Sequence, residues 1–138
     1  MSWDSYIDVL LQNSLDEQNV YHIDKVCILG REGGKWTSDE HQNALKILPD
    51  EVDAIVRAFE TKDFSDFQTN GVKCEGQTYK FLRNEEDLLL AKQKDEGALV
   101  VQRSKTAIVI AHMPEGKQQG KTNYAVAKIV DYLISLDM

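Results

Sequence analysis

The chain has 138 residues, of which 42% are hydrophobic, and its formal net charge is −7. This length suits one compact domain with its own core, so we expect residues 1–138 to form a single domain. An acidic chain is a poor general nucleic-acid binder, because phosphate binding needs a concentrated basic surface. No apolar run approaches the roughly 20 residues that span a bilayer. The opening residues also lack the basic segment of a signal peptide, so we expect a cytoplasmic protein.

The first predicted element is an amphipathic helix that follows Ser2 and ends near Asn13. Ser2 is a favourable N-cap residue, and Asp4 suits the first turn of a helix. Apolar side chains recur at the three- and four-residue intervals that place them on one helical face. They are Trp3, Tyr6, Ile7, Leu10 and Leu11.

A short apolar run over residues 26–29 predicts a buried strand. Residues 30–34 contain three glycines, which favour a tight turn, and residues 35–37 are expected to begin a returning strand. Trp36 would then lie just past a hairpin, near an end of the sheet.

Pro49 opens a second predicted helix, since proline is well suited to the first helical turn. Its apolar face comprises Val52, Ile55, Val56 and Phe59.

After Asn70-Gly71 the hydrophobic period changes to two, which is typical of strands. Residues 72–74 and 78–83 predict a hairpin, and residues 88–92, 98–103 and 107–112 predict three more strands. Short links between successive strands favour an antiparallel meander. A loop over residues 113–121 precedes a closing helix over residues 122–136. One antiparallel sheet covered by helices accounts for this order, because each apolar helix stripe must be buried.

Aromatic side chains near both ends of the chain are candidates for a binding surface. Tyr132 falls at the edge of the apolar stripe of the last helix, and Trp3 and Tyr6 lie in the first turn of the first helix. If these helices pack side by side, the three rings converge, and Trp36 can join them. Such a strip suits a polyproline II ligand, whose rings pack on aromatics and whose carbonyls accept hydrogen bonds. The alternative is that Trp3 and Tyr6 simply close the core at the helix end.

The sequence contains no recognisable catalytic or metal-binding pattern. Cys27 and Cys74 lack metal-type spacing, and we interpret them as buried thiols. The histidines stand alone, and no nucleophile–base pair or phosphate-binding loop is apparent. We therefore expect a protein that is not an enzyme and that needs neither a metal nor a cofactor.

Several segments, taken together, resemble the profilin family over essentially the whole chain. Residues 1–8 are similar to the family's opening motif, residues 33–36 to its hairpin with a second tryptophan, and residues 70–72 and 76–79 to its central hairpin. Asn123 and residues 131–134 match its last helix. The resemblance implies an α+β fold, with a central antiparallel sheet, the N- and C-terminal helices packed on one face and shorter helices on the other.

The resemblance also implies two binding faces. A poly-proline groove would contain Trp3, Tyr6, Trp36, Tyr132 and Leu133. An actin-binding face would contain Arg83, Lys92, Lys94, Gln118, Gly120, Asn123, Tyr124 and Lys128. Three positions depart from the family pattern: Ala91 stands near a position where other members have Arg, Lys128 where others often have Glu, and Met138 where some end in an aromatic residue.

The function implied by the resemblance is binding of actin monomers and of proline-rich peptides, with regulation of actin filament assembly. The expected partners are monomeric actin, proline-rich elongation factors and, weakly, phosphoinositides, for an otherwise monomeric protein associated with the cytoskeleton. The alternative is a longin-like or other small trafficking scaffold, which would not need an exposed aromatic strip.

Overall fold

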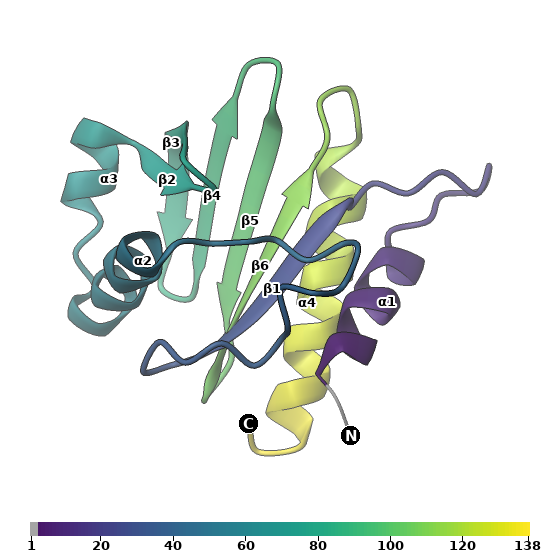
Figure 1. Ribbon diagram of the computed structural model, residues 1–138, viewed down its shortest axis with the longest axis horizontal. Coiled ribbons are helices and arrows are strands. Elements are labelled where there is room, and N and C mark those ends of the chain that lie inside the picture. Colours follow the sequence, from purple (N-terminus) through teal and green to yellow (C-terminus); the bar gives the residue numbers. More distant parts are fainter. Residues whose placement is uncertain (1–2) are drawn as a thin grey trace.

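The computed structural model describes residues 3–138, which form a six-stranded antiparallel sheet with helices on both faces (Figure 1). The helices are α1 (Asp4–Asn13), α2 (Pro49–Thr61), α3 (Ser65–Asn70) and α4 (Gln119–Ser135). The strands are β1 (Lys25–Gly30), β2 (Val72–Cys74), β3 (Gln77–Glu85), β4 (Leu88–Gln93), β5 (Gly97–Arg103) and β6 (Ala107–Met113). The expected α+β fold, with the terminal helices on one face, is confirmed.

The sheet has the order β1-β6-β5-β4-β3-β2, so five successive strands form the predicted meander and β1 pairs with the last of them. Side chains alternate between the two faces of a strand. In β4, for example, Leu89 and Ala91 contribute to one core, whereas Leu90 between them contributes to the other. The sheet therefore separates two apolar cores.

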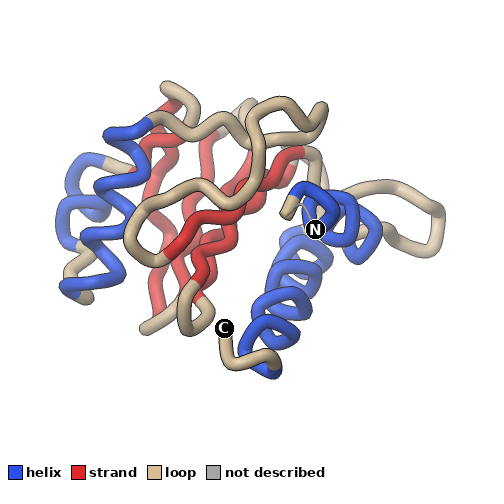
Figure 2. Tube along the Cα trace, turned by 60° about the horizontal axis from the view of Figure 1, so that its bottom comes forward, coloured by secondary structure: helices blue, strands red, loops and turns tan. Residues whose placement is uncertain are grey.

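The two cores lie under different pairs of helices. Figure 2 shows these two pairs on opposite sides of the sheet. One core lies beneath α2 and α3 and includes Phe59, Phe64 and Phe67. The other lies beneath α1 and α4, where Ile7 and Leu10 of α1 meet the apolar stripe of α4. α4 packs over β5 and β6, and α1 packs beside α4 and over β1. The first and last helices are thus neighbours.

The returning strand predicted over residues 35–37 does not form. A single antiparallel bridge joins Leu29 to Lys35, and the main-chain N–H groups of Trp36 and Thr37 both point to the Ile28 carbonyl. The Thr37 hydroxyl accepts the Ile28 N–H, at 3.1 Å, in place of a main-chain carbonyl. A side chain therefore ends the ladder after one bridge, and β1 pairs further along with Ala44 instead.

Other differences from the predicted elements are small. α3 was not expected, because six residues carry too little periodicity to reveal a helix. α4 begins at Gln119, three residues before the predicted start. The proposed N-cap Ser2 lies outside the described residues. Within residues 3–138, no helix combines the length and apolar character required to cross a bilayer.

Candidate functional site

Four aromatic rings from three distant segments form a continuous row, here called the aromatic strip. The Trp36 ring lies 4.6 Å from that of Trp3, the Trp3 ring is stacked 4.9 Å from that of Tyr6, and the Tyr6 ring lies 6.4 Å from that of Tyr132. These centroid distances are within the range of favourable aromatic pairs. Every aromatic residue that the sequence placed in the proposed groove is therefore part of one surface.

The strip exists because α1 and α4 share one core and because residues 30–38 fold back toward α1. The start of α1 and the end of α4 lie close together (Figure 1). Asp4 accepts the Ser38 main-chain N–H at 2.6 Å, which holds the segment after Trp36 against the first turn of α1. A Cβ atom at Gly30 would lie closer than 3.0 Å to the Trp36 indole nitrogen. Gly30 thus leaves room for that indole.

The strip remains open to solvent, although three of its rings also pack on the core. Tyr132 is 49% exposed, whereas Trp3, Tyr6 and Trp36 are half-buried against the core under α1 and α4. Trp3 and Tyr6 therefore close the core at the start of α1 and also expose part of their rings to solvent. The two indole N–H groups have no acceptor among the described residues. Burial, followed by the neighbouring Tyr132 phenol, raises the pKa of Tyr6.

Leu133 differs from the other residues expected in the groove. Its side chain is fully buried in the core beneath α4, so it cannot touch a ligand on the surface. It belongs with Ile129 to the core against which Trp3, Tyr6 and Trp36 pack, so it supports the strip from inside. The family resemblance placed Leu133 in the groove beside Tyr132, but one residue turns the side chain by about 100° on a helix.

Part of the same sheet face is left uncovered beyond α4, and it is basic. Lys92 pairs across the sheet with Lys80, and alternation along β4 places Lys92 on the face of Leu90, which is the face covered elsewhere by α4. Lys80, Lys92 and Lys94 line a shallow depression of about 390 Å³ together with the exposed Leu82. Arg83 follows Leu82 after a register shift in β3. The sequence analysis did not name Lys80 and Leu82 as site residues. The alternation of β3 could have revealed them, because both side chains are exposed on either side of a more buried aromatic residue.

The remaining candidates for an actin face lie on the first half of α4. Gln118 and Gly120 are exposed at its start, and Asn123 is half-buried there. Tyr124 is 58% exposed, and the Lys128 ammonium lies 5.8 Å from the centre of its ring. The actin candidates therefore form two groups, one on β3 and β4 and one on α4.

Two buried histidines hold the backbone that carries these groups. His22 accepts the Gln118 main-chain N–H at Nδ1, at 2.9 Å, so its Nε2 carries the hydrogen that is donated to Asp16. His112 donates from Nε2 to the Glu96 carbonyl at 2.7 Å and faces the Asp24 carboxylate, at 2.6 Å, through Nδ1. The first anchors the start of α4, and the second anchors the β4–β5 turn beside Lys94.

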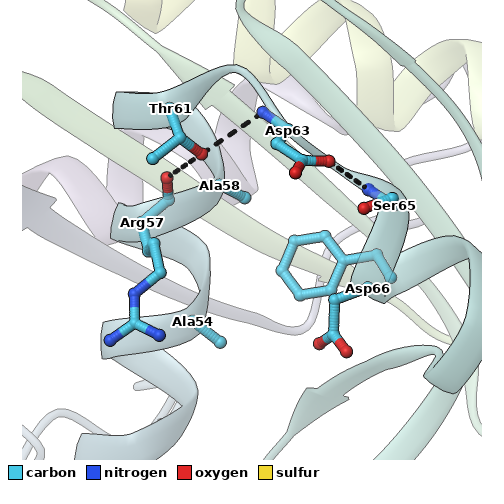
Figure 3. Close-up of a pocket in the computed structure, with 8 residues that line it drawn as sticks. Ala54, Arg57, Ala58, Thr61, Asp63, Ser65 and Asp66 are labelled. Carbon is cyan, nitrogen blue, oxygen red and sulfur yellow. Dashed lines mark hydrogen bonds between the residues drawn. The ribbon is translucent and has the colours of Figure 1, made fainter.

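A separate depression of about 290 Å³ lies between α2 and α3 (Figure 3). Two of the side chains drawn there bond to nearby backbone: the Thr61 hydroxyl donates to the Arg57 carbonyl and accepts the Asp63 N–H, and Asp63 accepts the Ser65 N–H. These bonds build the turn between the two helices. None of the predicted site residues lies there, and the described residues include no cluster of potential metal ligands.

The fold and the strip define the class of the protein: a small α+β protein whose terminal helices present exposed aromatic rings on one side of an antiparallel sheet. The family model for profilin matches residues 1–138. A profilin of Clypeaster japonicus is 53% identical over 140 residues, covering 100% of both chains. The chain belongs to the profilin family.

The solved structures that resemble this fold are profilins as well. Profilin II of Acanthamoeba castellanii matches with a TM-score of 0.83 and 24% identity, over 99% of this chain and 100% of that one. Mouse profilin IIa, solved in complex with a double repeat from the FH1 domain of mDia1, matches with a TM-score of 0.72 and 22% identity over 100% of both chains. At these identities the likeness concerns the fold.

Proposed function

We propose that this protein binds monomeric actin and proline-rich segments on separate surfaces and thereby regulates actin filament assembly in the cytoplasm, without catalysis. The observation that carries the proposal is the aromatic strip, in which four rings lie in an unbroken row and Tyr132 is half exposed. A longin-like scaffold, the other class considered, gives no reason for such a strip.

The chemistry of the strip suits a polyproline II helix. That helix lacks internal hydrogen bonds, so its carbonyls are free to accept, and its restricted backbone loses little entropy on binding. The rings of Trp3, Tyr6 and Tyr132 provide flat apolar faces, and the indole N–H groups provide donors without an internal acceptor. The mouse relative in complex with an FH1 repeat supports this assignment.

The basic sheet face and the first half of α4 support the actin assignment. Lys92 and Lys94 share one depression, and an acidic partner surface would be drawn to them by charge complementarity. The depression at β3 and β4 lies on the side of α4 that is remote from α1, whereas the strip lies between α4 and α1. We therefore propose that both ligands bind at once. Phosphoinositides, which would also use these lysines, are proposed only as weak partners, because each basic group adds about 1 kcal/mol.

Titration with a proline decamer, followed by intrinsic tryptophan fluorescence, tests the strip. Exposed aromatic anchors at the centre of an interface contribute about 2 kcal/mol or more, so Tyr132→Ala should weaken binding about 30-fold, and Trp3→Ala should abolish it. Tyr21→Ala is the matched control, because Tyr21 is similarly exposed, at 45%, but lies outside the strip. Unchanged affinity in both strip variants would refute the assignment.

Assembly of pyrene-labelled actin tests the basic face. Reversal of two charges in Lys92→Glu with Lys94→Glu should weaken actin binding roughly tenfold or more, while the proline decamer binds as before. The control is Lys46→Glu with Lys73→Glu, which changes the net charge equally at exposed positions outside this face. If the first variant, still folded, loses both activities together, the model of two independent faces is wrong.

A further inference from the structure

His22 holds the start of α4, and we propose that its imidazole positions this segment for actin and releases it when the ring gains a proton. Acidification would then weaken actin binding and leave the aromatic strip unchanged. The end of the loop between α1 and β1, which carries His22, lies beside the start of α4 (Figure 1). Three residues proposed for the actin face, Gln118, Gly120 and Asn123, lie there. The inference rests on the proposed binding of actin.

The first turn of α4 depends on His22 because it lacks a side-chain cap of its own. A helix start leaves main-chain N–H groups without partners inside the helix. Gln118 occupies the N-cap position, and its side chain makes no capping bond. Its main-chain N–H is donated instead to Nδ1 of His22, at 2.9 Å. The Thr122 hydroxyl donates to the His22 carbonyl at 2.8 Å, so the ring and the main chain of one residue both bind this turn. Gly120 in the same turn has a poor helix propensity and adds little stability.

The imidazole of His22 accepts a hydrogen bond only while it is neutral. Its Nε2 carries the hydrogen that binds Asp16, at 2.9 Å, which leaves the lone pair of Nδ1 for the Gln118 N–H. A second proton is added at Nδ1, where it faces that N–H group directly. His22 is 3% exposed, so water does not replace the lost acceptor unless the segment moves. Imidazole is the side chain whose charge ordinarily changes between about pH 8 and pH 5, so acidification breaks this bond.

The charges around His22 decide that the start of α4 moves and that the ring stays. The Asp16 carboxylate attracts an imidazolium at Nε2, whereas the N-terminus of α4 carries the positive end of its helix dipole and repels one. Within residues 3–138, the other charged side chains on the adjoining segments form no hydrogen bond or ion pair with the imidazole. They are Asp8 on α1, Glu17 in the loop, Asp24 and Lys25 at the start of β1, His112 on β6, and Glu115, Lys117 and Lys121 beside the start of α4.

The two other histidines show why pH acts on α4 through His22. His41 has the same bonding pattern away from α4: its Nδ1 accepts the Asn43 N–H at 2.9 Å, and its Nε2 faces a carboxylate at 3.0 Å. A proton on His41 therefore breaks a bond in a loop outside the proposed actin face. His112 differs, because its ring nitrogens face the Glu96 carbonyl and the Asp24 carboxylate, which are both acceptors. A proton on His112 breaks neither bond.

Two substitutions at position 22 separate the roles of the two ring nitrogens. In His22→Asn the amide oxygen takes the place of Nδ1, so it accepts the Gln118 N–H at any pH. In His22→Gln the longer side chain reaches the place of Nε2, and no acceptor remains for that N–H. Affinity for actin monomers is measured at about pH 7.5 and about pH 6.0. The native protein and His41→Asn are measured beside them, because actin itself responds to pH.

Loss of one hydrogen bond of this kind changes an equilibrium about five-fold. Between the two pH values, the native protein and His41→Asn should therefore lose about five-fold more actin affinity than His22→Asn, and His22→Gln should bind weakly at both. The proline decamer should bind all four proteins equally at both pH values. In the native protein, the NMR signals of the His22 ring and of the Gln118 amide should shift with one common midpoint.

Equal losses of actin affinity in the native protein and in His22→Asn would overturn the inference while the proposed function stands. The same holds if the His22 ring stays neutral down to about pH 6. The titration needs no variant, so it decides the question even where a variant fails to fold. Absence of actin binding at both pH values would overturn the proposed function together with the inference.

Discussion

Glu51 is a buried carboxylate whose removal should cost more stability than that of any neighbouring acid. It is 4% exposed and accepts three main-chain N–H groups: that of Leu48 at the start of α2 at 2.9 Å, and those of Glu75 and Gly76 in the β2–β3 turn at 2.7 and 2.8 Å. Glu75 and Gly76 have φ angles of 52° and 79°. A two-residue turn with positive φ at both positions normally favours Asn-Gly. Glu75 adopts positive φ with strain, and the Glu51 carboxylate compensates for that strain by accepting its N–H.

The magnitude follows from the number of bonds and from what replaces them. A hydrogen bond to a charged group contributes about 1.5–3 kcal/mol, but the turn amides lie near solvent and regain water when the side chain is removed. We therefore take the low end for each of the three bonds and expect Glu51→Ala to lower the free energy of unfolding by about 4–5 kcal/mol. Glu51→Gln retains one acceptor oxygen but turns an amide NH₂ toward a main-chain N–H group. We therefore expect it to lower the free energy of unfolding by about 2 kcal/mol.

Urea denaturation, followed by tryptophan fluorescence, measures these changes. Asp53→Ala is the matched control, because Asp53 is an exposed acid on the same helix and should change stability by no more than about 0.5 kcal/mol. The amides of Glu75 and Gly76 should also exchange faster with solvent hydrogen in the Glu51 variants. A loss below about 1 kcal/mol in Glu51→Ala, with those two amides still protected, would refute the reasoning.

Two further predictions concern acid stability and a constrained turn. The hydrogen bond from His22 lowers the pKa of Asp16 from 3.8 to about 2. The ionised Asp16 therefore stabilises the folded state above pH 4, and this stabilisation is lost as the pH falls toward 2. Asp16→Asn should show a shallower decline in unfolding free energy across that window. Gly97 has a φ of +111°, and a Cβ atom there would collide with the main-chain oxygen of Met113. Gly97→Ala should therefore lower the thermal midpoint by roughly 10 °C or prevent folding. Gly120→Ala should not, because the space around Gly120 is open. Equal slopes with pH, or equal midpoints for the two alanine variants, would contradict these expectations.

The sequence predicted most of the elements because their periodicity is local. The two-residue period after Gly71 located β2 to β6 within a few residues, and the apolar stripes located α2 and α4. The failures also have a local cause. The strand expected at residues 35–37 looked extended, but the Thr37 hydroxyl takes the place of a carbonyl partner, which no hydrophobic pattern records.

The candidate sites were predicted less evenly. The aromatic residues of the strip could be named from their types and from their places in the terminal helices or, for Trp36, beside a predicted turn, and the structure brings all four together. Leu133, in contrast, is buried, and Lys80 joins Lys92 only because of the register between β3 and β4. Burial and register depend on pairing between segments far apart in the chain, and a single sequence does not specify that pairing.

Local preferences follow from the order of residues alone: where the chain is helical or extended, which face of each element is apolar, and which aromatic and basic side chains are available. The meeting of Trp3, Trp36 and Tyr132 in one row, and the bonds that Glu51 accepts from a turn 25 residues away, depend instead on how the elements pack. The physical reason is that periodicity reports the environment of one element, whereas a binding surface is made by the packing of several elements on a shared core.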